Sequence, residues 1–160
     1  ITRYRLSTQI EDQSRAFLQG LTELINPRWL RLFNTEELRV LVTGADTPID
    51  VEDLRRNTVY GGYHEKDMAV QYFWEALSSL DQASLKAFLR FVTSSPNPPL
   101  LGFSELNPKF AIRHAGDDIT RLPTASTCVN LLKLPAYNST AQCLEKVKYA
   151  IYSGAGFDLS

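Results

Sequence analysis

The stretch RLPTASTCVNLLKLP, residues Arg121–Pro135, is the part of the chain richest in residues that can carry chemistry. Its first half is rich in hydroxyl groups, and its second half is an apolar run typical of a short buried strand. Cys128 lies where the two halves meet, so its backbone is expected to be held by a sheet while its thiol stays accessible. An accessible thiol is a nucleophile once it ionises. Packing as a small buried apolar residue is the other interpretation, and spacing alone does not separate the two.

Outward from this stretch, residues 47–160 predict a compact α+β fold. Runs of strand formers at Phe110–Ile112 and Val129–Leu134, each bounded by Pro or Gly, predict a small β-sheet. Helical periodicity and capping residues predict four helices in the same part of the chain. These helices are expected at Asp50–Asn57, Met68–Leu77, Asp81–Val92 and Ser139–Gly154. Helices followed by short strands indicate helices packed on a small sheet.

Two segments of this module are expected to be irregular. Tyr60–Tyr63 contains paired glycines that permit positive backbone φ, which predicts a loop. Ser94–Pro99 contains three prolines in its last four positions, and these remove donors and fix torsions.

Residues 1–46 predict two helices joined by a short turn. Apolar residues recur at helical spacing over Gln9–Ile25, and Asn26-Pro27 ends that helix. Asn34, followed three residues later by Glu37, predicts a capped second helix that closes at Gly44. Five turn formers follow without an apolar anchor, which predicts a hinge between residues 1–46 and residues 47–160. They are Gly44, Ala45, Asp46, Thr47 and Pro48.

Composition limits the classes of function. The 160 residues are 44% hydrophobic and 22% charged, enough for one core and inconsistent with a disordered chain. The 17 Lys and Arg residues nearly balance 18 Asp and Glu residues, so charge gives no reason to expect nucleic acid or an anionic membrane as a partner. No apolar run approaches the ~20 residues of a membrane span, and no leader pattern opens the chain. The only methionine is Met68, so Ile1 is expected to be an internal position of a longer protein.

The cysteines and histidines offer few alternatives to a single reactive thiol. Cys128 and Cys143 have no spacing typical of zinc, so no metal or cofactor is expected, and two reduced thiols in an intracellular protein are the simplest expectation. Cys143 falls inside the last helix and is expected to be packed. A hydrolase dyad of Cys128 with His114 is one alternative, although His114 is rather expected at the surface at a strand end, and His64 in a loop.

The Cys128 stretch resembles the catalytic loop of HECT-type E3 ubiquitin ligases. The family's pattern corresponds here to Leu122-Pro123, Thr127–Asn130 and Leu134-Pro135. Further motifs follow in the family's order and approximate spacing. They are Tyr60–Tyr63, Phe73-Trp74, Phe88–Thr93, Pro98–Phe103 and Gly156–Ser160, with Phe17, Gly20 and Glu37–Gly44 before the hinge. The forms PPLLGF, TASTC and AGFDLS are most similar to the proteasome-associated branch of the family.

The resemblance implies a division into two lobes. Residues 1–46 would be the helical tail of the N-terminal lobe, and residues 47–160 the complete C-terminal lobe with the catalytic cysteine. The rest of the N-terminal lobe, including the surface that docks the conjugating enzyme, would lie outside these 160 residues. The implied partners are ubiquitin, a ubiquitin-conjugating enzyme, protein substrates and the proteasome, and the implied compartments are the cytoplasm and the nucleus.

The resemblance also implies roles for residues of the site. Cys128 would accept ubiquitin as a thioester and pass it to a substrate lysine, without a cofactor. Thr127, Asn130 and Phe157 would support transfer, Thr127 and Asn130 by fixing either the loop or the reacting carbonyl. The catalytic loop would further comprise Arg121, Leu122, Pro123, Thr124 and Ser126. A binding module that holds ubiquitin or a proteasome subunit without turnover is the alternative function.

Two departures from the family leave the general base unassigned. Ser126 stands where many members have His, and Ser160 where some end in an acidic residue. Asp118, Asp158 and the terminal carboxylate are the remaining candidate proton acceptors.

Overall fold

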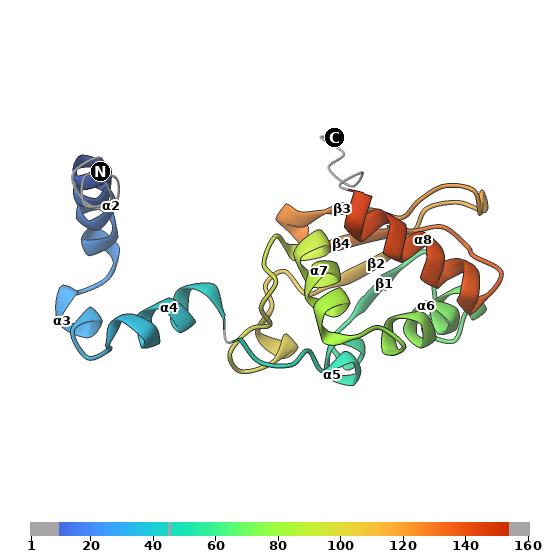
Figure 1. Cartoon of the computed structure of the whole chain (residues 1–160), viewed down its shortest axis with the longest axis horizontal. Helices are drawn as coiled ribbons and strands as arrows, with labels where there is room; N and C mark the ends of the chain where they lie inside the picture. The colour runs from blue at the N-terminus through green and yellow to red at the C-terminus, as the bar shows by residue number, and fades with distance from the viewer. Residues whose placement is uncertain (1–9, 45, 154–160) are drawn as a thin grey trace. The chain divides into compact units, whose positions relative to one another are not determined.

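The computed structural model of the chain describes residues 10–44 and 46–153, which separate into two compact units, 1–42 and 43–160 (Figure 1). The helices of the first unit are α2 (Glu11–Leu24), α3 (Pro27–Leu30) and α4 (Thr35–Thr43), and α4 reaches the boundary. The two helices predicted before the hinge are therefore confirmed. The turn expected between them contains a single helical turn, α3.

Local capping explains where these helices begin. Asn34 Oδ1 accepts from the Glu37 backbone nitrogen at 2.9 Å, and Glu37 Oε2 accepts from the Asn34 nitrogen at 2.7 Å, the reciprocal pair of a capping box. No described side chain of the first unit is buried. Several of its apolar residues are exposed; Phe17 is 69% and Leu24 87% exposed.

The second unit is an α+β module, as predicted. Its helices are α5 (Val51–Arg56), α6 (Met68–Ser78), α7 (Gln82–Thr93) and α8 (Thr140–Ser153), with 3-10 turns η2 (Phe103–Glu105) and η3 (Thr127–Val129). Its strands are β1 (Val59–Gly61), β2 (Ala111–His114), β3 (Thr124–Ser126) and β4 (Leu131–Leu134). Asp81 caps α7, as its position in the sequence predicted, by accepting from the Ser84 nitrogen at 2.7 Å.

The four strands form one mixed sheet in the order β1-β2-β4-β3. β1, β2 and β4 are parallel, whereas β3 pairs with β4 in the antiparallel direction. Ile112 and Leu132 are paired on adjacent strands and fully buried, so they mark the face of the sheet that the core covers. In Figure 1, α7 and α8 lie in front of the strands, and α7 packs against both β3 and β4.

Two strands were not expected from the sequence. Tyr60 and Gly61 belong to β1 rather than to a loop, and β3 precedes Cys128. Both are three-residue edge strands, too short for periodicity to reveal, and each exists through pairing with a partner elsewhere in the chain. Gly62 has the positive φ, 71°, that the paired glycines predicted. The strand expected from Val129 begins only at Leu131, because Thr127–Val129 form η3.

Candidate active site around Cys128

Cys128 lies at the tip of the connection between β3 and β4. Ser126 is paired with Leu131, so the residues from Thr127 to Asn130 make the turn between the two strands. The turn is a single 3-10 helix closed by the Asn130 nitrogen, which donates to the Thr127 carbonyl at 3.3 Å. Cys128 is exposed, so its thiol can be reached from solvent.

Asn130 holds this turn to the rest of the sheet. It has φ 50° and ψ 41°, a left-handed conformation that Asn tolerates better than most residues. Its side chain is buried, and Nδ2 donates to the Pro108 carbonyl at 2.6 Å. Its own carbonyl accepts from the Ala111 nitrogen at 3.0 Å, where the pairing of β2 with β4 begins. Thr127 is half-buried beside it.

The remaining loop residues, 121–126, precede the turn in the chain. Thr124 and Ser126 are half-buried positions of β3, Pro123 is buried, Leu122 is half-buried and Arg121 is exposed. The Tyr137 hydroxyl donates to the Arg121 carbonyl at 2.7 Å, and Lys146 Nζ of α8 donates to the Thr120 carbonyl at 3.0 Å. Sequence reasoning missed both anchors, because neither position carries a local motif.

The candidate proton acceptors fall into two groups. Asp118 accepts from both the backbone nitrogen and the hydroxyl of Thr120, at 3.0 and 2.6 Å, and these hydrogen bonds lower the pKa of its carboxyl group. A carboxylate stabilised in this way is a weaker base. Phe157, Asp158 and Ser160 lie outside the described residues.

The second cysteine differs from the first in its burial. Cys143 is fully buried in α8, and burial raises the pKa of its thiol to about 12. Because the thiolate is the nucleophile, Cys143 is inert at neutral pH. The expectation of a packed Cys143 is confirmed.

The register of β2 against β4 contradicts the hypothesis of a Cys128–His114 dyad. Ala111 is paired with Leu131 near the turn, whereas His114 is paired with Leu134 at the other end of the two strands. Three residues of strand separate these ends by about 10 Å. His114 instead lies 3.2 Å from Asp117 through Nε2 and contacts the Tyr63 ring edge-on.

The predicted hinge, residues 44–48, is held at Asp46 and closely approached at Gly44. The Thr43 carbonyl accepts from Asn97 Nδ2 at 3.2 Å, and Asp46 forms an ion pair with Lys86 of α7. Gly44 has φ 80°, and a Cβ atom there would lie 2.7 Å from the Pro98 carbonyl oxygen, so glycine is required. Thr47 and Pro48 are exposed. Ala45 lies outside the described residues.

Immediately after this segment, Gln82 binds both backbone groups of Ile49. The Ile49 nitrogen donates to Oε1 at 2.7 Å, and Nε2 donates to the Ile49 carbonyl at 3.2 Å. The side of the linker nearest α5 is therefore bound to α7.

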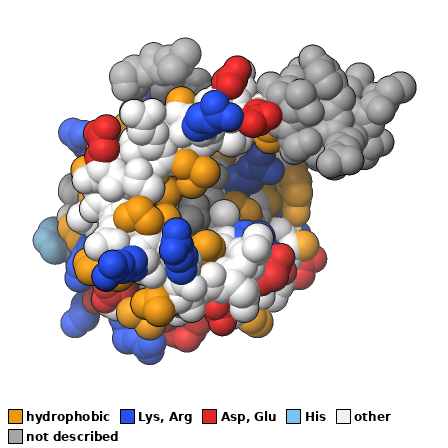
Figure 2. All heavy atoms as spheres, turned by 90° about the vertical axis from the view of Figure 1, so that its left-hand side faces the viewer, with side chains coloured by type: hydrophobic (Ala, Val, Ile, Leu, Met, Phe, Trp, Pro, Cys, Tyr) orange, Lys and Arg blue, Asp and Glu red, His pale blue; other side chains and the backbone are white. Residues whose placement is uncertain are grey.

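Among the described residues there is neither a group of metal ligands nor a helix that could span a membrane. Across residues 10–44 and 46–153, no three His, Cys, Asp or Glu side chains come together as metal ligands would. Nor does the described part of the chain contain a helix of the length and apolar character needed to cross a membrane. On the face drawn in Figure 2, hydrophobic, basic and acidic side chains are interspersed.

Comparison with known proteins gives one consistent result. The family described as HECT-domain (ubiquitin-transferase) matches residues 1–160. The chain is 49% identical to E3 ubiquitin-protein ligase HUL5 of Saccharomyces cerevisiae, 45% to E3 ubiquitin-protein ligase UPL6 of Arabidopsis thaliana and 40% to ubiquitin-protein ligase E3B of Homo sapiens. Each alignment covers 100% of this chain but only 18%, 16% and 17% of the respective relative.

Proposed function

The chain belongs to the HECT-domain (ubiquitin-transferase) family, and from this we propose that it is the part of a ubiquitin ligase that carries ubiquitin on Cys128. The Cys128 thiolate attacks the C-terminal thioester carbonyl of ubiquitin on a conjugating enzyme. A new S–C bond forms at Cys128, the old C–S bond breaks, and the conjugating enzyme leaves as a thiolate. Because attacking and leaving groups are both thiolates, this exchange needs no strong base.

One observation carries the choice of Cys128. Of the two thiols, Cys128 is exposed on a turn that a hydrogen-bonded framework holds, whereas Cys143 is buried with a raised pKa. The family's roles for Thr127, Asn130 and Phe157 are part of the same proposal.

In the second step, a substrate lysine attacks the Cys128 thioester. Its amine nitrogen forms the isopeptide bond, the Cys128 thiolate leaves, and the amine loses a proton. The hydrogen bonds to Asp118 argue against that carboxylate as the acceptor of this proton. The remaining candidates for the acceptor of this proton are Asp158 and the terminal carboxylate.

The wider assignment follows the family. We propose that residues 1–46 are the tail of the N-terminal lobe and residues 47–160 the C-terminal lobe, and the division of the chain after residue 42 supports this. The chain spans less than a fifth of the length of the relatives compared. Docking of the conjugating enzyme, recognition of substrates, contact with the proteasome and residence in the cytoplasm or nucleus are proposed for the longer protein.

The test is to mix this chain with ubiquitin that carries a small-thiol thioester at its C-terminus, which needs no docking surface. We expect an adduct on a non-reducing gel that thiol reductant removes. Cys128→Ala is expected to abolish the adduct, and Cys143→Ala is the matched control that retains it. Equal adducts in both variants would refute the assignment.

The alternative, a binding module without turnover, makes a different prediction. It expects no adduct with any variant, together with chemical-shift changes when labelled ubiquitin is titrated to near-millimolar concentration.

A further inference from the structure

Asn130 and Ser84 are the buried polar residues of the described chain, each 7% exposed. Ser84 is bonded to Tyr152 at 2.9 Å between α7 and α8, far along the sequence from the thiol. Asn130 lies two residues from Cys128, and its Nδ2 donates one of its two N–H groups to the Pro108 carbonyl at 2.6 Å. A buried polar group with a short hydrogen bond is costly to disrupt, since its partner would be left unsatisfied.

The contacts of Asn130 attach the turn to residues 108–111, at the start of β2. Its side chain binds Pro108 and its carbonyl binds Ala111, so both contacts reach the segment that leads into β2. Its nitrogen meanwhile closes the 3-10 turn on Thr127. Both attachments reach residues 108–111, whereas Cys128 itself is exposed.

We infer that Asn130 is a positioning residue for Cys128: it fixes η3 against the segment that precedes β2 and so aims the thiol, without contacting the transferred ubiquitin. The inference rests on the function proposed above. That proposal allows Asn130 either to fix the loop or to bind the reacting carbonyl, and the inference chooses the first role. Nδ2 is held at the Pro108 carbonyl and Asn130 is only 7% exposed, so its second N–H has little room to reach a carbonyl outside the turn. Pro108, which no motif singled out, thereby becomes part of the site's support.

The physical effect of this attachment is orientation. Thioester exchange requires the sulfur to approach the carbonyl carbon along a narrow range of directions, and misplacement by about 1 Å costs up to about 100-fold in rate. A small alkylating reagent has no such requirement, because it approaches an exposed thiol from any open side. Loss of the attachment should therefore slow acyl transfer from ubiquitin far more than alkylation.

The test uses the 160-residue chain and the same small-thiol ubiquitin thioester. Asn130→Gly keeps the left-handed backbone but removes the amide, and Asn130→Asp keeps the size but replaces the donor with an acceptor. Ser84→Ala, which also removes the hydrogen bond of a buried polar side chain, is the control for stability alone. Loading rates are measured against ubiquitin-thioester concentration, and iodoacetamide rates at Cys128 are measured in parallel.

We expect both Asn130 variants to lose at least about 10-fold in maximal loading rate. The half-saturating ubiquitin concentration, the alkylation rate and the loading rate of Ser84→Ala should all stay within about twofold of the parent. Loading at the parent's rate by either Asn130 variant would overturn the inference. So would a raised half-saturating concentration at unchanged maximal rate, which would indicate contact with ubiquitin, or an equal fall in alkylation. Failure of the parent to load, or loading of Cys128→Ala, would instead refute the proposed function on which the inference rests.

Discussion

At the scale of single residues, the two cysteine side chains differ in their exposure to solvent. Cys128 faces solvent on a turn, whereas Cys143 is enclosed by the core between α8 and its neighbours. Tyr63 shares this enclosure: its hydroxyl donates to the Leu134 carbonyl at 3.0 Å, and burial, followed by the nearby Asp117 carboxylate, raises its pKa to about 12. Both Cys143 and Tyr63 therefore favour the neutral form in the folded protein.

These raised pKa values predict a loss of stability in alkali. In the unfolded chain, Cys ionises near pH 8.5 and Tyr near pH 10. Since the folded pKa of Cys143 and of Tyr63 is about 12, their contribution is complete below about pH 8.5 and is lost as the pH rises through 12. We expect the urea midpoint to fall between pH 8.5 and 11, and to fall less steeply in Cys143→Ala. A midpoint that is constant over this range would contradict the prediction.

Helical position indicated the packed state of Cys143, and the family resemblance indicated Cys128 and Asn130, because helical position and motif are both local properties of the sequence. The sequence did not separate the two roles of Asn130, since the contact with Pro108 joins segments about twenty residues apart. For the same reason it kept His114 as a partner of Cys128 until the register of β2 against β4 placed them at opposite ends.

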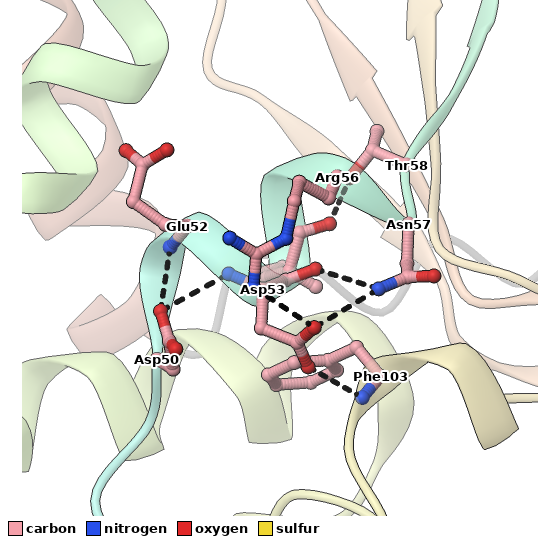
Figure 3. A network of polar contacts seen from close by, with 8 residues as sticks. Asp50, Glu52, Asp53, Arg56, Asn57, Thr58 and Phe103 are labelled. Atoms are coloured by element: carbon pink, nitrogen blue, oxygen red, sulfur yellow. Dashed lines mark hydrogen bonds and ion pairs between the residues drawn. The ribbon is translucent and has the colours of Figure 1, made fainter.

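At the scale of elements, Asp53 of α5 fixes the turn before η2 (Figure 3). Its Oδ2 accepts from the Phe103 nitrogen at 2.8 Å, and its Oδ1 accepts from Asn57 Nδ2 at 3.1 Å. Asp53→Ala is expected to lower the free energy of unfolding by about 1–3 kcal/mol, because the Phe103 donor loses its partner. Urea unfolding measures this loss.

Two variants sharpen the interpretation of Asp53→Ala. Asp53→Asn should lose less, since an amide oxygen still accepts from Phe103. Glu52→Ala changes an exposed neighbour in the same helix and should stay within about 0.5 kcal/mol of the parent. Equal losses for Asp53→Ala and Glu52→Ala would show that the contact with Phe103 contributes nothing.

A similar prediction concerns Gln82, which binds the backbone of Ile49 at the end of the linker. Gln82→Ala removes both hydrogen bonds to the Ile49 backbone, each worth about 1 kcal/mol. Amide hydrogen exchange at Ile49 should therefore accelerate roughly 10-fold or more. Arg90→Ala, at an exposed position of the same helix, is the control. Unchanged exchange at Ile49 in Gln82→Ala would mean that α7 does not hold the linker.

The elements that the sequence predicted well are those with strong local signals. Helices with a capping residue and a long apolar face were found close to their true bounds, for example Gln82–Thr93 after Asp81. β1 and β3 were missed because three residues carry no periodicity, and their existence depends on partners in β2 and β4. The predicted hinge has the right composition for a turn, but its contact with α7, the ion pair between Asp46 and Lys86, depends on a residue distant in the sequence.

At the scale of the whole molecule, the core lies entirely in the second unit. Every buried hydrophobic residue of the described chain, from Ile49 to Ala150, is found there. We expect a chain of residues 43–160 to keep the Tm of the 160-residue chain to within about 2 °C, since loss of about 1 kcal/mol would shift it by several degrees. A fall of 5 °C or more on calorimetry would show that residues 1–42 stabilise the module.

The strand order also has a consequence for how the chain is made. β4 is the last strand to be synthesised, yet it lies between β2 and β3 in the sheet. The ribosome delivers a chain from its N-terminus at about 5–20 residues per second, so Cys128 is synthesised before Leu131–Leu134 exist. Until β4 is available, β3 has no partner, and β2 has only β1. Each newly made chain therefore carries the thiol for a short time before the sheet that places it has formed.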